Sequence, residues 1–261
     1  MDDRKSVGKL PSLVIVALIY LFLYLPILIL LIFSFNTAQF PAPWSSFTLD
    51  WYRELFQSSY LWKSFGNSLI VAISATSISL TAGVGLIFYA AGGGKIGKYM
   101  GMFYGNLVIP ETVLAVSLLS FFTLIEIPLG LTTLILAHAV LGLGFVIPIV
   151  YARYKELDYT LTEASLALGA TSLQTFFKVT LPLLRPTLTT TALLVFIISF
   201  DDFILSYFCA GSSSQTLSLY ILSMIRTGVS PMVNALSSVL LFFSSLLVLL
   251  FFSIKTKARF V

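Results

Sequence analysis

Residues 13–33 read LVIVALIYLFLYLPILILLIF, a run without a single charged side chain. At about 1.5 Å per helical residue, a run of this length crosses the roughly 30 Å hydrocarbon core of a bilayer. A cleaved signal peptide is the alternative interpretation, but the run is longer than a signal core and no small-x-small cleavage pattern follows it. We therefore expect an uncleaved transmembrane helix in this stretch.

The composition of the whole chain supports the same interpretation. Of its 261 residues, 58% are hydrophobic and only 10% are charged, whereas a soluble domain carries about 25% charged residues. Spanning β-strands need roughly ten alternating residues each, and the apolar runs here are longer and apolar on every side. The net charge of +4 does not indicate nucleic acid, because the basic residues flank the apolar runs. We expect an all-α transmembrane protein solvated by the lipid bilayer.

Long intervals with few charged residues divide the chain into six expected spans within one transmembrane domain, residues 1–261. Lysine and arginine concentrate on the cytoplasmic side of membrane proteins. With the N-terminus inside, 12 of the 15 lysine and arginine residues lie on the inner side, so both termini are expected in the cytoplasm. The spans are expected at about residues 13–33, 68–89, 99–122, 132–150, 187–209 and 235–253.

The sequence contains no pattern for nucleotide binding, catalysis or metal binding. Gly92-Gly93-Gly94-Lys95 is followed by Ile96, so it lacks the G-x-x-x-x-G-K-[ST] spacing of a phosphate-binding loop and is expected to be a flexible turn. Cys209 is the only cysteine and is expected to pack as a small apolar residue. We expect no enzyme activity, no metal and no cofactor in this chain, so that any ATPase is a separate protein.

The inner segment 153–186 is too polar to span and is expected to form a helical hairpin. Thr160 and Glu163 have the spacing of a capping box, as do Thr171 and Gln174. Gly169 lies between the two boxes and is expected to end the first helix. The second helix is expected to end near Leu181-Pro182. The first helix presents an apolar tip, which requires a partner; its apolar residues are Leu161, Ala164, Leu166 and Leu168.

The order of residues in this hairpin resembles the EAA signature of ABC importer permeases. Glu163-Ala164-Ser165 is followed after three residues by Gly169, and after nine more by Val179-Thr180-Leu181-Pro182. The departures from that signature are Ser165 for alanine and Val179 for isoleucine. The resemblance implies a six-helix, type I (MetI-like) permease fold whose inner hairpin is the coupling helix that docks on the ATPase. The residues expected to couple to the ATPase are Glu163, Ala164, Ser165, Leu168, Gly169, Leu181 and Pro182.

Four further segments extend the resemblance over nearly the whole chain: Leu25-Pro26-Ile27, Pro110-Glu111, Asp201-Asp202 and residues 228–235 (GVSPMVNA). They are similar to the second permease subunit of bacterial spermidine/putrescine importers, where an aspartate usually follows the span-three proline. The resemblance implies a bacterial inner-membrane protein that works with a second permease subunit, ATPase subunits that bind ATP, and an extracytoplasmic polyamine-binding protein.

Three acids within the expected spans point to a cationic substrate. Glu111, Asp201 and Asp202 would together cost roughly 8–10 kcal/mol if exposed to lipid, so they must face a cavity, pair across a subunit interface or be protonated. Counted along the helices, all three lie at a similar level in the outer half of the bilayer, where a negative ring selects cations.

Helical spacing separates the two aspartates. Asp202 shares a face with Ser199 and Ser206, which suits a wet pathway, whereas the neighbours of Asp201 are apolar and suit a contact with the partner permease. Pro110 removes one helical hydrogen bond and is expected to free the carbonyl of Asn106 for an ammonium group. The expected substrate-pathway residues are Asp202, Glu111, Asp201, Ser199, Ser206 and Asn106.

Two alternatives stay open. The first is an ABC permease for another cation, such as iron. The second is a proton-coupled secondary transporter or channel that uses His138 and the acids, although His138 also suits an interhelical hydrogen bond. The second alternative leaves the hairpin signature unexplained.

Overall fold

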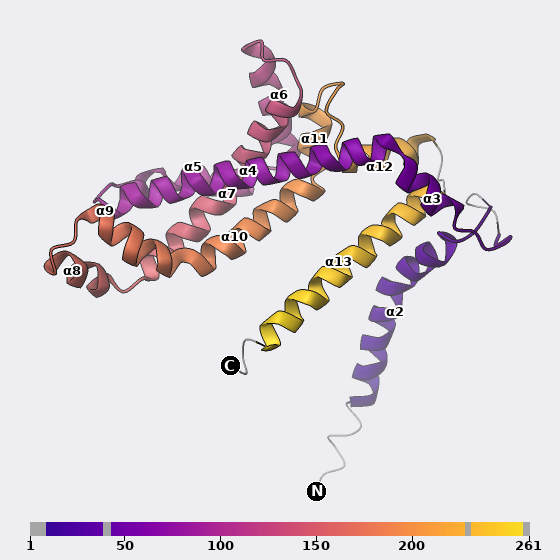
Figure 1. Cartoon of the computed structure of the whole chain (residues 1–261), viewed down its shortest axis with the longest axis horizontal. Coiled ribbons are helices and arrows are strands. Elements are labelled where there is room, and N and C mark those ends of the chain that lie inside the picture. Colours follow the sequence, from indigo (N-terminus) through magenta and orange to yellow (C-terminus); the bar gives the residue numbers. More distant parts are fainter. Residues whose placement is uncertain (1–8, 39–42, 228–230, 258–261) are drawn as a thin grey trace, which may run out of the picture. The chain divides into compact units, whose positions relative to one another are not determined.

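The computed structural model describes residues 9–38, 43–227 and 231–257 (Figure 1). Over these ranges the chain is helical, and its β-type pairing is one isolated antiparallel bridge between Asn36 and Phe47. In chain order the elements are α2 (Lys9–Phe33), α3 (Asp50–Gln57), α4 (Ser59–Ala91), the 3-10 turn η1 (Ile96–Tyr99), α5 (Met100–Val108), α6 (Glu111–Leu124), α7 (Leu131–Glu156), α8 (Tyr159–Ala167), α9 (Ser172–Thr175), the π-helical turn η2 (Phe176–Thr180), α10 (Leu181–Asp201), α11 (Ile204–Cys209), α12 (Leu217–Thr227) and α13 (Pro231–Lys257).

The helices long and apolar enough to cross a membrane fall on expected spans, with two differences. Four qualify among the described residues, in α2, in α4, in α7 and in the run from α9 to α10. Expected span three is a broken pair bent by 108° between α5 and α6, which gives a fifth if the pair counts as one span. Expected span five is broken after Asp201. Expected span six lies on α13, whose described side chains end at Leu246, so the number of six spans stays a prediction.

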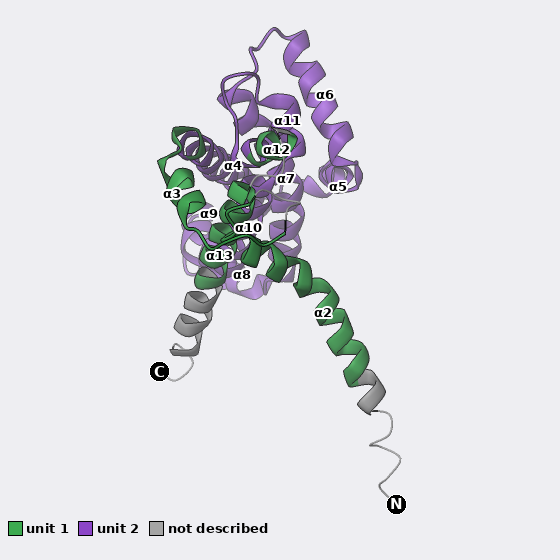
Figure 2. Cartoon of the chain, turned by 90° about the vertical axis from the view of Figure 1, so that its right-hand side faces the viewer, with its two compact units in different colours: residues 1–61, 221–261 green, residues 62–220 purple. Residues whose placement is uncertain are grey.

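Contacts divide the chain into two units, each with its own packing (Figure 2). In the unit of residues 62–220, α7 is the central helix and packs against α5, α10 and α11. Buried apolar side chains of α7 contribute to three core clusters. One of these clusters joins α7 to α4, η2 and α10 through Ile87, Val146, Phe176 and Val195.

Small residues let the helices of this unit approach closely, as is usual in membrane proteins. A Cβ added at Gly142 of α7 would clash with the Ser79 hydroxyl of α4 and lie 2.9 Å from a methyl group of Val195 on α10. The same hydroxyl donates a hydrogen bond of 3.0 Å to the carbonyl of Ala139. Glycine at position 142 therefore sets the separation of three helices.

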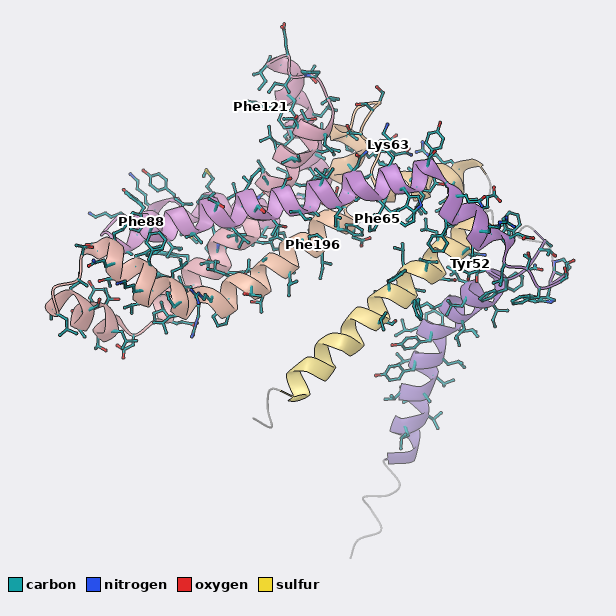
Figure 3. The ribbon with its side chains drawn as sticks, in the orientation of Figure 1. Tyr52, Lys63, Phe65, Phe88, Phe121 and Phe196 are labelled. Carbon is teal, nitrogen blue, oxygen red and sulfur yellow. The ribbon has the colours of Figure 1, made fainter. Side chains whose placement is uncertain are left out.

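In the unit of residues 1–61 and 221–261, α13 packs against α2 and α3. The connection between α2 and α3 folds back so that Trp51 and Tyr52 of α3 contact the end of α2 and the residues after it. The Tyr52 hydroxyl lies 2.7 Å from that of Ser34, and Trp51 Nε1 donates to the Asn36 carbonyl at 2.9 Å. Figure 3 labels Tyr52 at this end of α3. The segment thus packs against the end of α2.

Candidate functional site

The first helix break lies at Pro110. Helix α5 ends at Val108 and α6 begins at Glu111, so the proline separates two helices rather than kinking one. Asn106 anchors the preceding helix, since its side-chain amide donates to the carbonyl of Val140 on α7 at 2.8 Å. Glu111 is the first residue of α6 and is half-buried. Its carboxyl group stands at the positive end of the α6 dipole, which stabilises negative charge.

The second break lies at Asp202, and it changes the helical-face argument for this residue. Its backbone is extended (φ −62°, ψ 130°), so α10 and α11 are not one helix. The Asp202 carboxylate accepts hydrogen bonds from the backbone N–H groups of Leu205 (3.4 Å) and Ser206 (3.0 Å). The Asp202 side chain therefore caps the first turn of α11 from one residue before the N-cap position, Phe203.

A buried polar cluster surrounds this carboxylate. His138 Nδ1 lies 2.8 Å from the Ser199 hydroxyl, and His138 Nε2 lies 3.4 Å from Asp202 Oδ2. The Glu111 carboxyl group is within hydrogen-bonding reach of that of Asp202. The cluster thus brings α6, α7 and α10 together at the two breaks, and it includes three of the expected pathway residues.

The two neighbouring aspartates differ sharply in exposure. The Asp202 side chain is 2% exposed, whereas Asp201 is exposed. The sequence led us to expect Asp202 to be the more accessible of the pair. The difference arises because the chain is extended at Asp202, which turns its side chain back toward α11. Ser206 is also buried, and its hydroxyl has no hydrogen-bond partner among the described residues.

Backbone anchors that the sequence analysis missed hold the second break. The Ser218 hydroxyl donates to the Asp202 carbonyl at 2.7 Å, and the Leu217 N–H donates to the Ser68 hydroxyl at 2.8 Å. At the other end of α11, the Thr133 hydroxyl donates to the Cys209 carbonyl at 2.9 Å. These are contacts between distant positions, and no local pattern in the sequence signals them.

An aromatic ladder joins α4 to the end of α10, next to Asp201. Ring centroids are 6.2 Å apart between Trp62 and Phe65, 5.9 Å between Phe65 and Phe200, and 5.9 Å between Phe200 and Phe196. Figure 3 labels Phe65 and Phe196, one on each helix. Aromatic faces attract cations, as a carboxylate does, so the ladder and the neighbouring Asp201 favour the same kind of ligand.

The inner hairpin begins with a cap different from the expected one. Asp158 is the N-cap of α8 and accepts hydrogen bonds from the Thr160 hydroxyl (2.7 Å) and N–H (3.0 Å). These two bonds hold the pKa of Asp158 below its usual value, and the bond from the Thr160 hydroxyl has the larger effect. The predicted capping box of Thr160 and Glu163 is wrong, because the helix begins two residues earlier, where Asp158 is the N-cap and accepts a hydrogen bond from the Thr160 N–H. Glu163 is exposed and makes no hydrogen bond or ion pair within the described chain.

The turn after α8 is as predicted. Gly169 has a positive φ of 86°, and its N–H donates to the Leu166 carbonyl while the Ala170 N–H donates to the Ser165 carbonyl. This pair of bonds is the Schellman helix stop. The predicted second capping box is confirmed by reciprocal bonds between Thr171 and Gln174 of 2.9 Å and 3.2 Å.

The second helix of the hairpin does not end at Leu181-Pro182, contrary to our expectation. It continues through the π-helical turn η2 into α10. Pro182 has no N–H to donate to the Lys178 carbonyl, and its ring crowds that carbonyl in a regular helix. The wider π turn just before the proline relieves this crowding, so the second arm of the hairpin is continuous with the α10 span.

The hairpin tip is apolar and exposed. Leu168 is 89% exposed, and Leu161 and Leu166 are also exposed. Inside the hairpin the Ser165 hydroxyl lies 3.0 Å from that of buried Thr175. Ser165, which departs from the EAA pattern, thus links α8 to α9. Ala164 and Gly169 are exposed, and Leu181 and Pro182 are half-buried at the start of α10.

Comparison with known proteins gives the same family over almost the entire chain. The family described as "Binding-protein-dependent transport system inner membrane component" matches residues 5–257. The spermidine/putrescine transport system permease protein PotC of Escherichia coli (strain K12) is 37% identical over 88% of this chain and 88% of its own length. The putrescine transport system permease protein PotI of the same strain is 33% identical over 92% of this chain and 89% of its own.

Solved structures show the same fold. A permease chain of a bacterial ABC transporter that imports the acidic polysaccharide alginate superposes with a TM-score of 0.71 at 17% identity, covering 95% of both chains. A chain of the MetNI methionine ABC transporter gives 0.57 at 22% identity, over 81% of this chain and 98% of the other. The all-α type I importer permease fold is thus confirmed. The chain therefore belongs to the family of binding-protein-dependent transport system inner membrane components, as a transport permease subunit rather than an enzyme.

Proposed function

We propose that this chain is one of two permease subunits of an ATP-driven importer that moves polyamine cations across the bacterial inner membrane, with both of its termini in the cytoplasm. An extracytoplasmic binding protein delivers the polyamine, and separate ATPase subunits bind and hydrolyse ATP. The relatives PotC and PotI are named for spermidine and putrescine transport, and they support this substrate class.

The fold alone does not choose the substrate, because the similar structures belong to importers of an acidic polysaccharide and of methionine. The observation that carries the proposal is the Glu111–Asp202 pair at the helix breaks. Neighbouring carboxyl groups repel each other when both are ionised, so a cation or a proton at Glu111 stabilises the pair. Among the described residues, the charged groups that act on Glu111 are Asp202 and His138, with no lysine or arginine, so the site offers no cationic side chain of that kind to an anion.

A polyamine also suits the surroundings of this pair. It is a chain of ammonium groups separated by methylene segments, and it needs acids for the first and apolar or aromatic surface for the second. Exposed Asp201 directly follows Phe200 of the aromatic ladder. We propose that Glu111 and Asp201 bind ammonium groups in turn while the aromatic rings contact the chain between them.

The exposed hairpin supports coupling to an ATPase. Its apolar tip, formed by Leu161, Leu166 and Leu168, requires a covering partner. Because α9 continues into α10, a push on the tip is transmitted along one helix to Asp201 and the second break. ATP binding by the partner would thereby open and close the acid site.

The test is uptake by the assembled importer in proteoliposomes, with labelled putrescine and spermidine. Glu111→Gln should raise the KM for uptake by about tenfold or more, since a charge-assisted bond to an ammonium group is lost. Glu156→Gln is the matched control, because within the described residues this exposed acid bonds only Arg153, three positions before it. It should leave KM unchanged.

Two outcomes would overturn the proposal. ATP-dependent uptake of an iron salt with no polyamine uptake would make the chain a permease for another cation. Uptake driven by a proton gradient, without the ATPase or ATP, would make it a secondary transporter.

A further inference from the structure

The acids at the two helix breaks differ in burial and in hydrogen bonding, and Asp202 is the most fully bonded of them. Both Asp202 carboxylate oxygens already have partners, with Oδ1 facing the Leu205 N–H and Oδ2 facing the Ser206 N–H and His138 Nε2. The side chain is 2% exposed. A passing ammonium group would have to break these bonds to reach it.

The backbone of the same residue is also engaged. Its carbonyl accepts the Ser218 hydroxyl at 2.7 Å from the segment that follows α11. Asp202 therefore holds three parts of the unit at once, since its side chain caps α11 and contacts α7 while its main chain binds the start of α12. Removing the carboxylate would leave two N–H groups of α11 unpaired in a buried place, which destabilises that short helix.

Glu111, in contrast to Asp202, is partly exposed and has a carboxyl group without a bonded donor in the part of the chain that the structure describes. It is half-buried rather than buried, and no hydrogen-bond donor within the described chain bonds its carboxyl group. Its carboxyl group lies near that of Asp202, and its place is set by the start of α6 after Pro110. Asp201 is exposed on the last turn of α10.

We infer that Asp202 is a positioning residue, which fixes the α10–α11 break, and that Glu111 and Asp201 are the acids that contact the cation. This inference rests on the proposed function for the identity of the cation. Its structural half, the anchoring of α11, does not depend on the substrate.

Asparagine separates the two roles at position 202. Its amide oxygen can accept from the Ser206 N–H as Oδ2 does, so that only the longer bond of 3.4 Å from the Leu205 N–H is lost. Asparagine caps helices as well as aspartate, but it carries no charge. A positioning residue should therefore tolerate Asp202→Asn and fail with Asp202→Ala, whereas a cation ligand should fail with both.

Cys209 supplies a readout that needs no transport. It is the only cysteine in the chain, the last residue of α11, and fully buried. In the assembled importer, its alkylation by N-ethylmaleimide can be followed by mass spectrometry of this subunit. Asp202→Ala should accelerate alkylation by about tenfold, the factor expected when a helix cap and a buried charged acceptor are lost together. Asp202→Asn and Glu111→Gln should change it by less than about twofold.

Uptake gives the second readout. Asp202→Asn should keep the KM for putrescine within about threefold, whereas Glu111→Gln should raise it by about tenfold. If Asp202→Ala does not assemble, Ser218→Ala replaces it. This variant removes the bond to the Asp202 carbonyl and the contact of 3.0 Å with the Thr216 hydroxyl, so Thr216→Val is its control, and Ser218→Ala alone should accelerate alkylation by about threefold.

The inference is overturned if Asp202→Asn raises KM as much as Glu111→Gln while Cys209 stays protected, because Asp202 is then a ligand. It is also overturned if neither Asp202→Ala nor Ser218→Ala accelerates alkylation. An unmodified importer that takes up no polyamine would refute the proposed function instead, and the alkylation rates would still decide whether Asp202 anchors α11.

Discussion

Replacing Gly169 by alanine isolates the backbone contribution of the helix stop in the hairpin. Gly169 has a φ of 86°, and a Cβ built on it would meet no atom within 4 Å. The substitution therefore creates no clash, and its whole effect comes from holding an L-residue in the left-handed region.

That strain amounts to about 1–2 kcal/mol, which is a factor of roughly 5–30 in the equilibrium between the closed turn and an open one. Opening the turn breaks the Gly169 and Ala170 bonds that end α8. The hairpin tip then no longer transmits force to α10 as a rigid body. Gly169→Asn should destabilise the closed turn less than Gly169→Ala, because asparagine tolerates the left-handed region better than alanine does.

Hydrogen exchange of residues 159–170 in the assembled importer measures the effect directly. Gly169→Ala should speed exchange there by roughly 5–30-fold, and more ATP should be hydrolysed per polyamine imported. Gly101→Ala is the matched control: Gly101 lies within α5 and also has no atom within 4 Å of a built Cβ. Equal exchange and equal coupling in the two variants would refute the reasoning.

Three further predictions concern the hairpin and the packing of α7. Asp158→Ala should increase hydrogen exchange in the first turn of α8. In the unmodified chain the pKa of Asp158 is lowered, so this cap contributes fully above about pH 4 and is lost as the pH falls through the lowered pKa. Exchange of that turn, corrected for its intrinsic pH dependence, should therefore rise in acid only. Ser165→Ala and Thr175→Val should each destabilise the hairpin, and their double-mutant cycle should give a coupling of about 0.5–1.5 kcal/mol; strictly additive effects would contradict the bond. Gly142→Ala should lower the free energy of unfolding by about 1–3 kcal/mol through overpacking, measured by denaturation in detergent, whereas Gly85→Ala, with open space around its Cβ, should not.

The hairpin shows which features a sequence predicts well. Gly169 and the Thr171–Gln174 box are local, since each depends on residues within five positions. The cap at Thr160 failed for a local reason as well, because two possible caps lay two residues apart and the stronger acceptor, Asp158, took the amide. Apolar runs likewise predicted the helices, since lipid imposes hydrophobicity residue by residue.

The breaks were harder to predict because they depend on distant partners. Pro110 indicated an interruption, but nothing local distinguishes a kink from a 108° bend. Asp202 follows fifteen non-proline residues with no helix-breaking signal, so a continuous helix was the natural expectation. The Ser218 hydroxyl and the His138 ring, which hold the break, are sixteen positions after it and sixty-four before it.

The acids and the breaks also explain each other. A carboxylate in a continuous span would be stranded, because every backbone N–H is already used within the helix. A break frees N–H groups, and Asp202 accepts two of them at the start of α11. Glu111 begins α6, where its charge faces the positive end of the helix dipole. The free energy that an isolated acid would lose at this depth is thus offset by bonds that the broken backbone needs in any case. This reciprocity lets the unit keep negative charge inside a membrane, and it requires that any substitution at Asp202 be judged first as a change in helix geometry and only then as a change in charge.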